Sequence, residues 1–530
     1  MNLRHAGGSA EIDERLAALL TNANAVRVIT SAVEGTIGPK GLDTMLVDRF
    51  GEVVITNDGV TILDKMDANH PAAKMLINIA KAQQNEVGDG TTTATIMAGS
   101  LVSEGVSQVM RGVPVARVIE GIKHGVSKAL EGIRERAFKV TDLTDPVLLN
   151  VAVIAGREHE DIANLVVEAA KLVGIDKLNE TNFKFSDIII AETGAENEVF
   201  MGVIVNQERM SREMPEMVQD AKILLIDDAL EPEELEDEAL GTEIGFRRYI
   251  DIQDEFKENA KKLVKLGINV IMVDRGVHEN AEEILADAGV MVVQRVSNKD
   301  LRRVADHTGS RAIKRSGLKK DAADIEKYLG YAQQVCQDEK LEHIRVIGGR
   351  GKPMATILVG AATEEVVDER ERITKDAASS VQAAVKGGVV PGGGAIEVAM
   401  SRELGKHREN LKGMTAYGLD SVIMALKKPL FQMVGNAGFN PLEKVEEVIT
   451  AQTSQNSDSL GIDCETGEVT DMFQKGIIDP ALVKYHAMKA AGEVAVAILR
   501  IDTIIKKKDE GNNASTKQPG IAQEASMPDF

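Results

Sequence analysis

The chain has 530 residues, which is too long for one ordinary domain, so we expect three or four domains. Asp and Glu outnumber Lys and Arg by 83 to 62, which gives a formal net charge of −21. A surface this acidic repels phosphate backbones and anionic lipids, so we expect no nucleic-acid partner and no membrane partner. Apolar residues make up 43% of the chain, which excludes wholesale disorder.

Several other classes of protein are excluded by residue usage. The two cysteines, Cys336 and Cys464, lie far apart and cannot build a disulfide framework or a cysteine-rich metal site. None of the nine histidines lies three or four residues from another, so ordinary zinc-ligand spacing is missing. The first 20 residues lack a basic segment followed by an apolar one, and the longest apolar stretches are far short of a membrane span. We therefore expect a cytoplasmic location.

The first 140 residues are predicted to be mostly helical. Apolar residues recur at helical spacing around 12–23 and again around 75–80. Two short β-like runs, Met45–Val47 and Val53–Thr56, lie between these helices. The stretch after Gly90 is apolar on nearly every side, which predicts a buried helix.

The centre of the chain changes character. Short β-branched runs at Lys222–Ile226, Asn269–Val273 and Met291–Val296 alternate with helical segments, which predicts an α/β layer with parallel strands. An acidic insertion, Glu231–Asp254, separates the first two runs and carries scattered apolar residues. Its charge leaves open whether it is only a solvated loop.

After residue 386 the chain is predicted to be helical again, and from about residue 506 it is polar and typical of a flexible tail. A helical beginning and a helical end around an α/β centre predict a discontinuous domain with the centre inserted into it.

The strongest motif is a glycine- and threonine-rich loop directly before the predicted buried helix. It consists of Gly88, Asp89, Gly90, Thr91, Thr92 and Thr93. A helix N-terminus offers unpaired N–H groups and a partial positive charge, which suit phosphate. Asp89 would then hold Mg²⁺ at the phosphates. Capping of the helix explains one Gly and one Thr but not three Thr in succession, so phosphate binding is favoured.

Three further loops could complete a nucleotide cradle, although each alone is an ordinary turn. They are Thr36-Ile37-Gly38-Pro39-Lys40-Gly41, Thr56-Asn57-Asp58-Gly59 and the segment from Gly387 through Gly392 and Gly393 to Gly394. The chain contains neither a P-loop nor a Rossmann fingerprint. Asp376 falls at the edge of the apolar stripe of a helix expected from about Glu364 to Lys386, and its spacing alone favours a surface charge over a base held in a cleft.

Taken together, these segments resemble a chaperonin, the ring-forming, ATP-driven protein-folding machine. The resemblance rests on TIGPKGLDTMLVD, TNDGVTILDKM, GDGTTTATIMAGSLV, VKGGVVPGGGAIEVA, ETGEVTDM and GIIDPALVKYHAMKAAGEVAVAILRID, which span almost the whole chain. It implies a multidomain α and α/β fold with three nested domains. The expected domains are a mainly helical, discontinuous equatorial ATPase domain (1–144 and 387–530), a small intermediate hinge domain (145–202 and 361–386), and an α/β apical domain (203–360) with a helical protrusion at about 231–256.

TNDG, ILRID and VVPGGGA are similar to the archaeal-type group II branch, which closes its chamber with a built-in protrusion and no separate lid protein. Other stretches, such as MATILVGAATEEV, resemble the bacterial branch, and the mixture suggests a bacterial protein of archaeal type, or group III. The implied partners are non-native polypeptides and further copies of the chain, in stacked rings that typically hold eight subunits. Gly202 and Gly360, which flank the apical segment, are candidate hinges or strand ends.

The resemblance also assigns site residues for ATP and Mg²⁺. Asp376 is the implied general base, with Asp58 positioning the attacking water, and Asp89 binds Mg²⁺. The implied phosphate contacts are Thr36, Ile37, Gly38, Pro39, Gly90, Thr91, Thr92 and Thr93. The implied nucleoside contacts are Gly393 and Asp479, with Asp463, Cys464 and Ile477 near the adenine, and Gly59, Gly88 and Gly392 are further implied nucleotide-binding residues.

One position departs from the group II pattern, because Arg157 stands where a lysine is usual. It keeps a positive charge, and we expect a nucleotide-dependent contact there, with a geometry different from that of lysine. Two other functions stay open from the residues alone. One is a soluble ATPase or phosphotransferase that acts on a small molecule, and the other is a ring-forming scaffold that no longer hydrolyses ATP.

Overall fold

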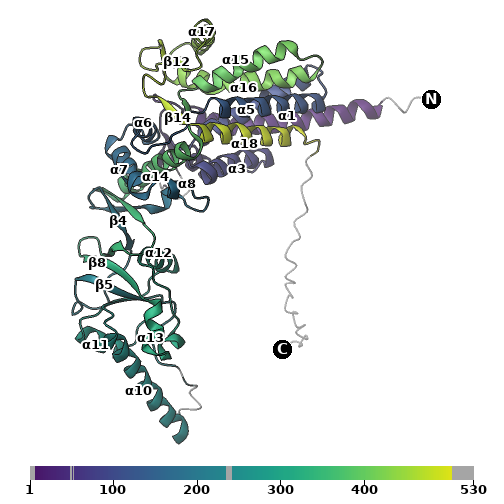
Figure 1. The fold of residues 1–530 in the computed structure, drawn as a ribbon. Coiled ribbons are helices and arrows are strands. Elements are labelled where there is room, and N and C mark those ends of the chain that lie inside the picture. The colour runs from purple at the N-terminus through teal and green to yellow at the C-terminus, as the bar shows by residue number, and fades with distance from the viewer. Residues whose placement is uncertain (1–5, 48–50, 52, 234, 236–241, 504–530) are drawn as a thin grey trace, which may run out of the picture.

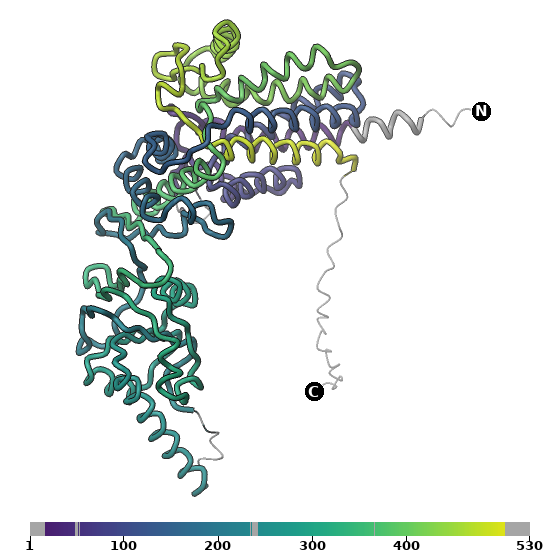
Figure 2. The backbone as a smooth tube through the Cα atoms, in the orientation of Figure 1, coloured from purple at the N-terminus to yellow at the C-terminus, as the bar shows by residue number. Residues whose placement is uncertain are grey.

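The computed structural model describes residues 6–47, 51, 53–233, 235 and 242–503. The predicted tail from about residue 506 and part of the predicted protrusion lie outside this range. The molecule is elongated, with a helical bundle at one end and an α/β body at the other (Figure 1). The chain begins in the bundle, crosses a middle part to the α/β body and returns to the bundle, so early and late segments lie side by side (Figure 2). The predicted multidomain α and α/β fold class is confirmed.

We refer to the bundle, the middle part and the α/β body as the equatorial, intermediate and apical parts, after the domains expected there. The core of the equatorial part joins helices from both ends of the chain. Buried residues of α1, α3, α4 and α5 pack with buried residues of α15, α16 and α18 in one cluster. The first group of elements is α1 (Ala6–Glu34), β1 (Thr44–Val47), β2 (Val53–Thr56), α2 (Gly59–Lys65), α3 (Pro71–Val87), α4 (Thr91–Met110) and α5 (Val115–Glu135). The second group is β11 (Val389–Pro391), α15 (Ala395–Asn410), α16 (Thr415–Asn436), α17 (Pro441–Ser454), β12 (Leu460–Ile462), β13 (Val469–Asp471), β14 (Ile478–Pro480) and α18 (Ala481–Leu499).

One helical stretch among the described residues, Leu16–Glu34 in α1, is long and apolar enough to cross a membrane by composition. Its residues Val26, Ile29 and Val33 are buried in the equatorial core. A core helix passes the same test of length and composition, and the packing of these residues accounts for the apolar face.

The intermediate part has its own core, in which α14 packs against α6, α7 and β3. Its elements are α6 (Pro146–Ala155), α7 (Glu160–Val173), α8 (Ile175–Asn179), η1 (Phe185–Ile188), β3 (Ile189–Thr193), β10 (Ala355–Ala361) and α14 (Glu364–Gly387). The long helix expected from about Glu364 to Lys386 is therefore present, one residue longer at its C-terminal end.

The apical part contains the predicted parallel strands. β5 pairs with β6 and β6 with β7, both in parallel, with Ile223 opposite Val270 and Val270 opposite Met291. The antiparallel strands β8 and β9 extend this sheet on the other side of β5. The apical elements are β5 (Met217–Ile226), α10 (Glu243–Lys265), β6 (Val270–Val273), α11 (Glu279–Asp287), β7 (Met291–Val293), α12 (Asn298–Thr308), η2 (Arg315–Lys319), α13 (Ala322–Ile325), η3 (Glu326–Tyr328), β8 (Gly330–Asp338) and β9 (His343–Gly349).

One strand, β4 (Glu198–Val205), is shared between the intermediate and apical parts. Its first half pairs with β10 and its second half with β9, so the sheet runs without a break in the order β3-β10-β4-β9-β8-β5-β6-β7. Gly202 lies where β4 changes partner, and Thr356 donates a hydrogen bond to its carbonyl oxygen at 2.8 Å. Gly360 lies inside β10, where a Cβ would stand 1.8 Å from the Ala195 carbonyl oxygen. Neither glycine ends a strand.

The insertion at Glu231–Asp254 is not only a solvated loop. From Glu243 onwards it is the first half of α10, which projects from the apical end of the molecule (Figure 1). Ile244 is 84% exposed and Phe246 57% exposed, whereas Ile252 is buried in the apical part. Tyr249 and Ile250 are also exposed, at 39% and 45%. The large apolar side chains from Ile244 to Ile250 are thus exposed, and packing begins at Ile252.

Candidate nucleotide site

The loop between α3 and α4 leaves a helix N-terminus open. Gly88 ends α3 and Gly90 precedes α4, and both have left-handed backbone angles, with φ of +72° and +76°. A Cβ at Gly88 would stand 2.3 Å from the Ser379 side chain, and one at Gly90 would stand 2.6 Å from Val483, so glycine is required for conformation and for space. No side chain caps α4. Its first N–H groups can therefore bind an anion.

Asp89 lies at this helix start with both carboxylate oxygens engaged. Oδ1 accepts a hydrogen bond from the Gly90 N–H at 2.5 Å, and Oδ2 accepts one from Ser380 Oγ at 2.9 Å. Burial raises the pKa of Asp89, the Ser380 bond lowers it, and the nearby charge of Asp479 raises it. A carboxylate in such acidic surroundings suits a divalent cation.

The second loop packs directly on the first. Asp58 caps α2, and its Oδ2 accepts hydrogen bonds from the Thr61 N–H at 2.9 Å and from Thr61 Oγ1 at 2.6 Å. A Cβ on Gly59 would stand 2.5 Å from Thr92 Oγ1. Close packing of this turn on the start of α4 thus requires glycine and brings Asp58 to the same site.

Asp376 reaches the site from α14, in the intermediate part. Its side chain is 14% exposed, and its Oδ2 lies 3.2 Å from Arg372 Nη1. Burial raises the pKa of Asp376 well above its ordinary value, Arg372 lowers it, and the charges of Asp89 and Asp58 raise it further. The surface interpretation favoured by spacing alone is therefore wrong, because α14 turns this edge of its stripe towards the phosphate loops.

Arg157 follows α6 in a left-handed conformation with φ of +52°. Its Nη1 lies 3.4 Å from Glu369 Oε1 on α14. Burial lowers the pKa of Arg157 and so does Arg372, whereas Asp376 and Asp58 raise it. The charges of Arg157 and the catalytic candidates therefore act on one another, which brings Arg157 into the site.

Four of the predicted nucleoside residues lie in or beside a short two-stranded sheet, in which β11 pairs with β14. The Gly392 N–H donates to the Ile477 carbonyl oxygen at 2.9 Å, and a Cβ on Gly392 would stand 3.1 Å from Asp479 Oδ2. Gly393 has φ of +61°, and its Cβ would stand 3.6 Å from Ile477 Cγ2. These four residues therefore lie together, and the charge of Asp479 raises the pKa of Asp89, which shows that they are close to the phosphate loop.

The loop at Thr36–Gly41 is anchored by α16 and not by the phosphate loops. Asn436 Nδ2 donates to the carbonyl oxygens of Ile37 at 3.0 Å and Glu34 at 2.9 Å. Thr36 Oγ1 bonds the Val33 carbonyl oxygen, and a Cβ on Gly38 would stand 2.8 Å from Met433 Cγ. Among the described residues, no hydrogen bond or ion pair joins Thr36, Ile37, Gly38 or Pro39 to Asp89 or Asp376.

The segment after β12 lies beside this loop. Lys40 Nζ is 3.5 Å from Glu465 Oε1, next to Cys464, whose thiol pKa is raised by burial. Asp463 accepts a hydrogen bond from the Glu465 N–H at 2.9 Å and pairs with Lys475 at 3.0 Å. Its carboxylate is thus already engaged within its own loop.

Lys484 on α18 is a site residue that no sequence pattern indicated. Its Nζ lies 2.8 Å from both Glu397 Oε1 and Asp479 Oδ2, and its side chain is 10% exposed. Burial lowers the pKa of Lys484, but the two carboxylates outweigh burial and the pKa is raised. The Lys484 ammonium thus holds the Asp479 carboxylate in place, and its charge also lowers the pKa of Asp89.

Gln83, Ser380 and Arg372 were also missed. Gln83 Nε2 donates to the carbonyl oxygens of Asp89 at 2.9 Å and Val483 at 3.1 Å, and so ties the phosphate loop to α18. Nothing in the local pattern of these residues distinguishes them from helix-surface polar groups. Gln83 and Ser380 have partners that are distant in sequence, Val483 and Asp89. The partners of Arg372 lie on its own helix, and only the burial of Asp376 beside the phosphate loops shows the role of Arg372.

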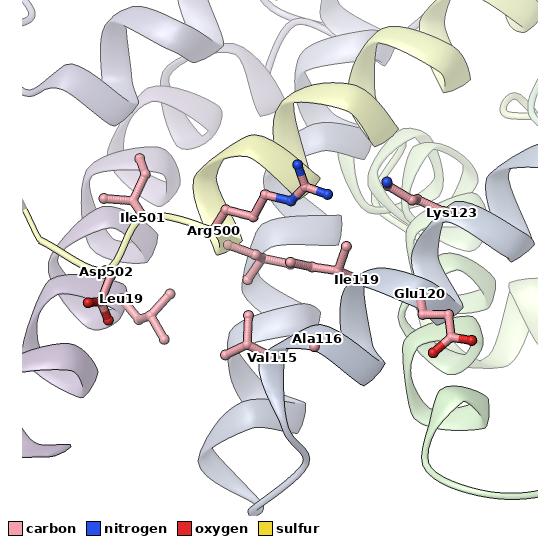
Figure 3. Close-up of a pocket in the computed structure, with 10 residues that line it drawn as sticks. Leu19, Val115, Ala116, Ile119, Glu120, Lys123, Arg500, Ile501 and Asp502 are labelled. Atoms are coloured by element: carbon pink, nitrogen blue, oxygen red, sulfur yellow. The ribbon is translucent and has the colours of Figure 1, made fainter.

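A separate hollow of about 620 Å³ lies at another place in the equatorial part, among α1, α5 and the end of α18 (Figure 3). Its lining residues are Leu19, Val115, Ala116, Ile119, Glu120, Lys123, Leu499, Arg500, Ile501 and Asp502. None of the predicted nucleotide residues lines it.

Comparison with known proteins places this site in a family. The family model described as the TCP-1/cpn60 chaperonin family matches residues 29–509. A thermosome subunit of Pyrococcus abyssi is 36% identical over 517 residues, covering 92% of each chain, and the thermosome subunit beta of Archaeoglobus fulgidus is 36% identical over 529 residues, covering 96% of this chain and 94% of the relative. A crystal structure of a group III chaperonin in the open state is 48% identical, with a TM-score of 0.87, and the match covers 93% of this chain and all of that one. The chain therefore belongs to the TCP-1/cpn60 chaperonin family, as the motifs predict.

Proposed function

We propose that this chaperonin subunit binds ATP with Mg²⁺ and hydrolyses it, and that turnover drives closure of a chamber around non-native polypeptides. The observation that carries the proposal is the meeting of Asp58, Asp89 and Asp376 at the uncapped start of α4. Two of these carboxylates come from the equatorial part and the third from the intermediate part. ATP bound there contacts both parts, so its presence can bias their relative position.

The donor set fits Mg²⁺ and a triphosphate. Asp89 would hold the metal, and the N–H groups and hydroxyls of Gly90, Thr91, Thr92 and Thr93 would bind phosphate oxygens. Among the described residues, no group of three His, Cys, Asp or Glu side chains forms a metal site of its own. That arrangement suits Mg²⁺, which commonly takes one or two carboxylates together with substrate phosphates. When bound, Mg²⁺ neutralises charge on the phosphate oxygens.

Hydrolysis needs an oriented water molecule and a proton acceptor. In this step the water oxygen forms a bond to the γ-phosphorus while the bond from that phosphorus to the bridging oxygen breaks. The proton of the water passes to the Asp376 carboxylate, with Asp58 helping to orient the water. Arg157 supplies positive charge close to both carboxylates. Gly59 and Gly88 give the backbone its close approach, and Thr36, Ile37, Gly38 and Pro39 border the phosphates from the α16 side.

The nucleoside would lie against Gly392, Gly393, Ile477 and Asp479, with Asp463 and Cys464 at its far edge. Asp479 is held by Lys484, so this contact is preorganised.

Closure would turn the apical part relative to the intermediate part at β4, where the strand changes partner. We propose domain boundaries near those predicted, with Gly202 at the turning point. Gly360 is packed inside β10 and is not proposed as a hinge. The exposed apolar residues of α10, including Ile244 and Phe246, would form the built-in lid and contact substrate or neighbouring subunits. No separate lid protein is then needed.

Assembly into stacked rings of the same chain, with eight subunits in each ring, would use exposed apolar surface of the equatorial part. The β1–β2 hairpin presents Met45, Val47, Val53 and Ile55 to solvent, each more than half exposed. Such a hairpin suits contact with a second copy. The chamber wall would be acidic and would adsorb folded proteins poorly. A cytoplasmic location and a bacterial source complete the proposal.

Phosphate release by the purified oligomer, together with electron microscopy with and without ATP, tests this function. Asp376→Ala should bind nucleotide and lose turnover, and the wild-type particles should be double rings that close with ATP. Normal hydrolysis by the variant would refute the mechanism. A monomer or dimer whose ATP use depends on a small metabolite would instead support a phosphotransferase, and rings without phosphate release would support a scaffold.

A further inference from the structure

We propose that Arg372 is a positioning residue for ATP hydrolysis, whose guanidinium, held by Glu369, fixes the carboxylate of Asp376. The inference rests on the proposed function, because it takes Asp376 to be the base. It gives Arg372 and Glu369 a part in the reaction, although neither residue belongs to the motifs or to the predicted site.

The three side chains form one continuous chain along α14. Glu369, Arg372 and Asp376 are spaced by three and four residues and so share a face of the helix. Arg372 Nε donates to Glu369 Oε2 at 2.9 Å, and Nη2 donates to the other oxygen of the same carboxylate. The third nitrogen, Nη1, donates to Asp376 Oδ2 at 3.2 Å. The guanidinium is therefore fixed on one edge by a two-point contact and directs its remaining donor at the base.

Asp376 depends on this contact. In the part of the chain that the structure describes, Arg372 is the residue that hydrogen-bonds or pairs with the Asp376 carboxylate. The other charges that act on Asp376 are Asp89, Asp58 and Arg157, and the first two repel it. Loss of Arg372 would leave a carboxylate that is free to rotate away from two negative neighbours.

Most ion pairs at this spacing do little, so burial and geometry decide the case. The same helix supplies a comparison, because Lys375 pairs with Glu371 at 2.6 Å with the same four-residue spacing. The side chains of that pair are 43% and 33% exposed, against 19% and 14% for Arg372 and Asp376. Among the described residues, Lys375 also lacks a counterpart to the two-point contact by which Glu369 fixes Arg372. Lys375 therefore serves as a matched control.

Glu369 extends the arrangement beyond α14. Its Oε1 also accepts from Arg157 Nη1 at 3.4 Å, so one carboxylate holds an arginine from the turn after α6 and an arginine of α14. Removal of its charge loosens both arginines at once. We therefore expect Glu369→Gln to act in the same direction as the loss of Arg372.

The experiment measures steady-state ATPase activity of the full-length oligomer with Mg²⁺ and ATP. Arg372→Gln should lower kcat roughly 10- to 100-fold, as a misplaced catalytic group does, while KM stays within about twofold. Arg372→Lys should recover part of the loss, because one ammonium cannot hold Glu369 at two points and still reach Asp376. Lys375→Gln should keep normal kcat.

A combination with Asp376→Asn shows whether Arg372 acts through the base. In that background Arg372→Gln should change the residual rate by less than about twofold, because the group that it positions is already gone. A further large loss would overturn the inference, and so would a raised KM with kcat unchanged, which would make Arg372 a simple binding contact.

The outcomes also separate this inference from the proposed function. An inactive Asp376→Asn variant beside a fully active Arg372→Gln variant overturns the role of Arg372 and leaves the proposed function standing. Normal turnover of Asp376→Asn itself overturns both. If Arg372→Gln does not assemble on sizing, Arg372→Lys and Glu369→Gln decide the case, and normal kcat in both would overturn the inference.

Discussion

Replacement of Lys484 by methionine should destabilise the equatorial part strongly. The side chain is almost buried, and its ammonium lies 2.8 Å from each of two carboxylates, Glu397 and Asp479. Removal of one partner of a buried ion pair typically costs about 3–5 kcal/mol, because the remaining charge is left without compensation. Here two carboxylates lose their common cation, so we expect a loss near the upper end of that range, about 4–5 kcal/mol.

The assay is urea unfolding followed by circular dichroism at one fixed subunit concentration, because association changes the apparent stability of an oligomer. Lys427→Met is the matched control. Its ammonium lies 3.4 Å from Glu446, which is largely exposed, and a surface pair of this kind contributes about 0–1 kcal/mol. The double variant Lys484→Met, Glu397→Gln should recover part of the loss, because it removes one of the two unpaired charges.

Two results would refute this reasoning. One is a loss below about 1 kcal/mol for Lys484→Met, equal to that of the control, which would show that water or rearrangement compensates the carboxylates. The other is a double variant as unstable as the sum of its single changes, which would show that the charges do not interact.

Three further predictions concern the base, the lid and β10. The raised pKa of Asp376 means that its protonated form favours the folded state, so this side chain contributes stability that is full below the ordinary pKa of aspartate and is lost as pH rises through the raised pKa. Over a pH series, the melting temperature of the nucleotide-free wild type should fall relative to that of Asp376→Asn across that interval and keep a constant offset above it, and an offset that is constant throughout would contradict this. Ile244→Ser with Phe246→Ser should leave subunit stability within about 0.5 kcal/mol but weaken capture of a denatured client and ATP-driven closure, and unchanged closure by electron microscopy would refute a lid role. Gly360→Ala should destabilise the subunit by about 1–3 kcal/mol, because its Cβ would lie 1.8 Å from a carbonyl oxygen. Gly405→Ala, in open space on α15, should be neutral or stabilising, and equal melting temperatures of the two variants would count against the clash.

Sequence patterns predicted the helices and strands that depend on neighbouring residues in the chain. The glycine- and threonine-rich loop before an apolar helix identified the start of α4, and β-branched runs identified the three parallel strands of the apical sheet. The orientation of Asp376 was not predictable in this way. Its spacing places it at the edge of a stripe, and only the packing of α14 against the equatorial loops brings that edge close to Asp58 and Asp89.

The supporting residues were out of reach of the sequence for the same reason. Lys484 and Glu397 lie far apart in the chain, and Gln83 bonds a carbonyl oxygen 400 positions away. A charged side chain is buried only where a partner of opposite charge or a hydrogen-bonding group compensates it. No local sequence pattern identifies a partner that is so distant in the chain. The resemblance to a family supplied the roles of the loops but not this second layer of contacts.

The shared equatorial core has a consequence for synthesis of the chain. Helices α1, α3, α4 and α5 leave the ribosome first, yet their apolar faces are covered by α15, α16 and α18, which follow after about 260 intervening residues. At about 5–20 residues per second, the first half of the core waits roughly 13–52 s for the start of the second. During that interval the nascent subunit exposes apolar surface of the kind that chaperones bind. A chain of this family is therefore itself a candidate chaperone client while it is being synthesised.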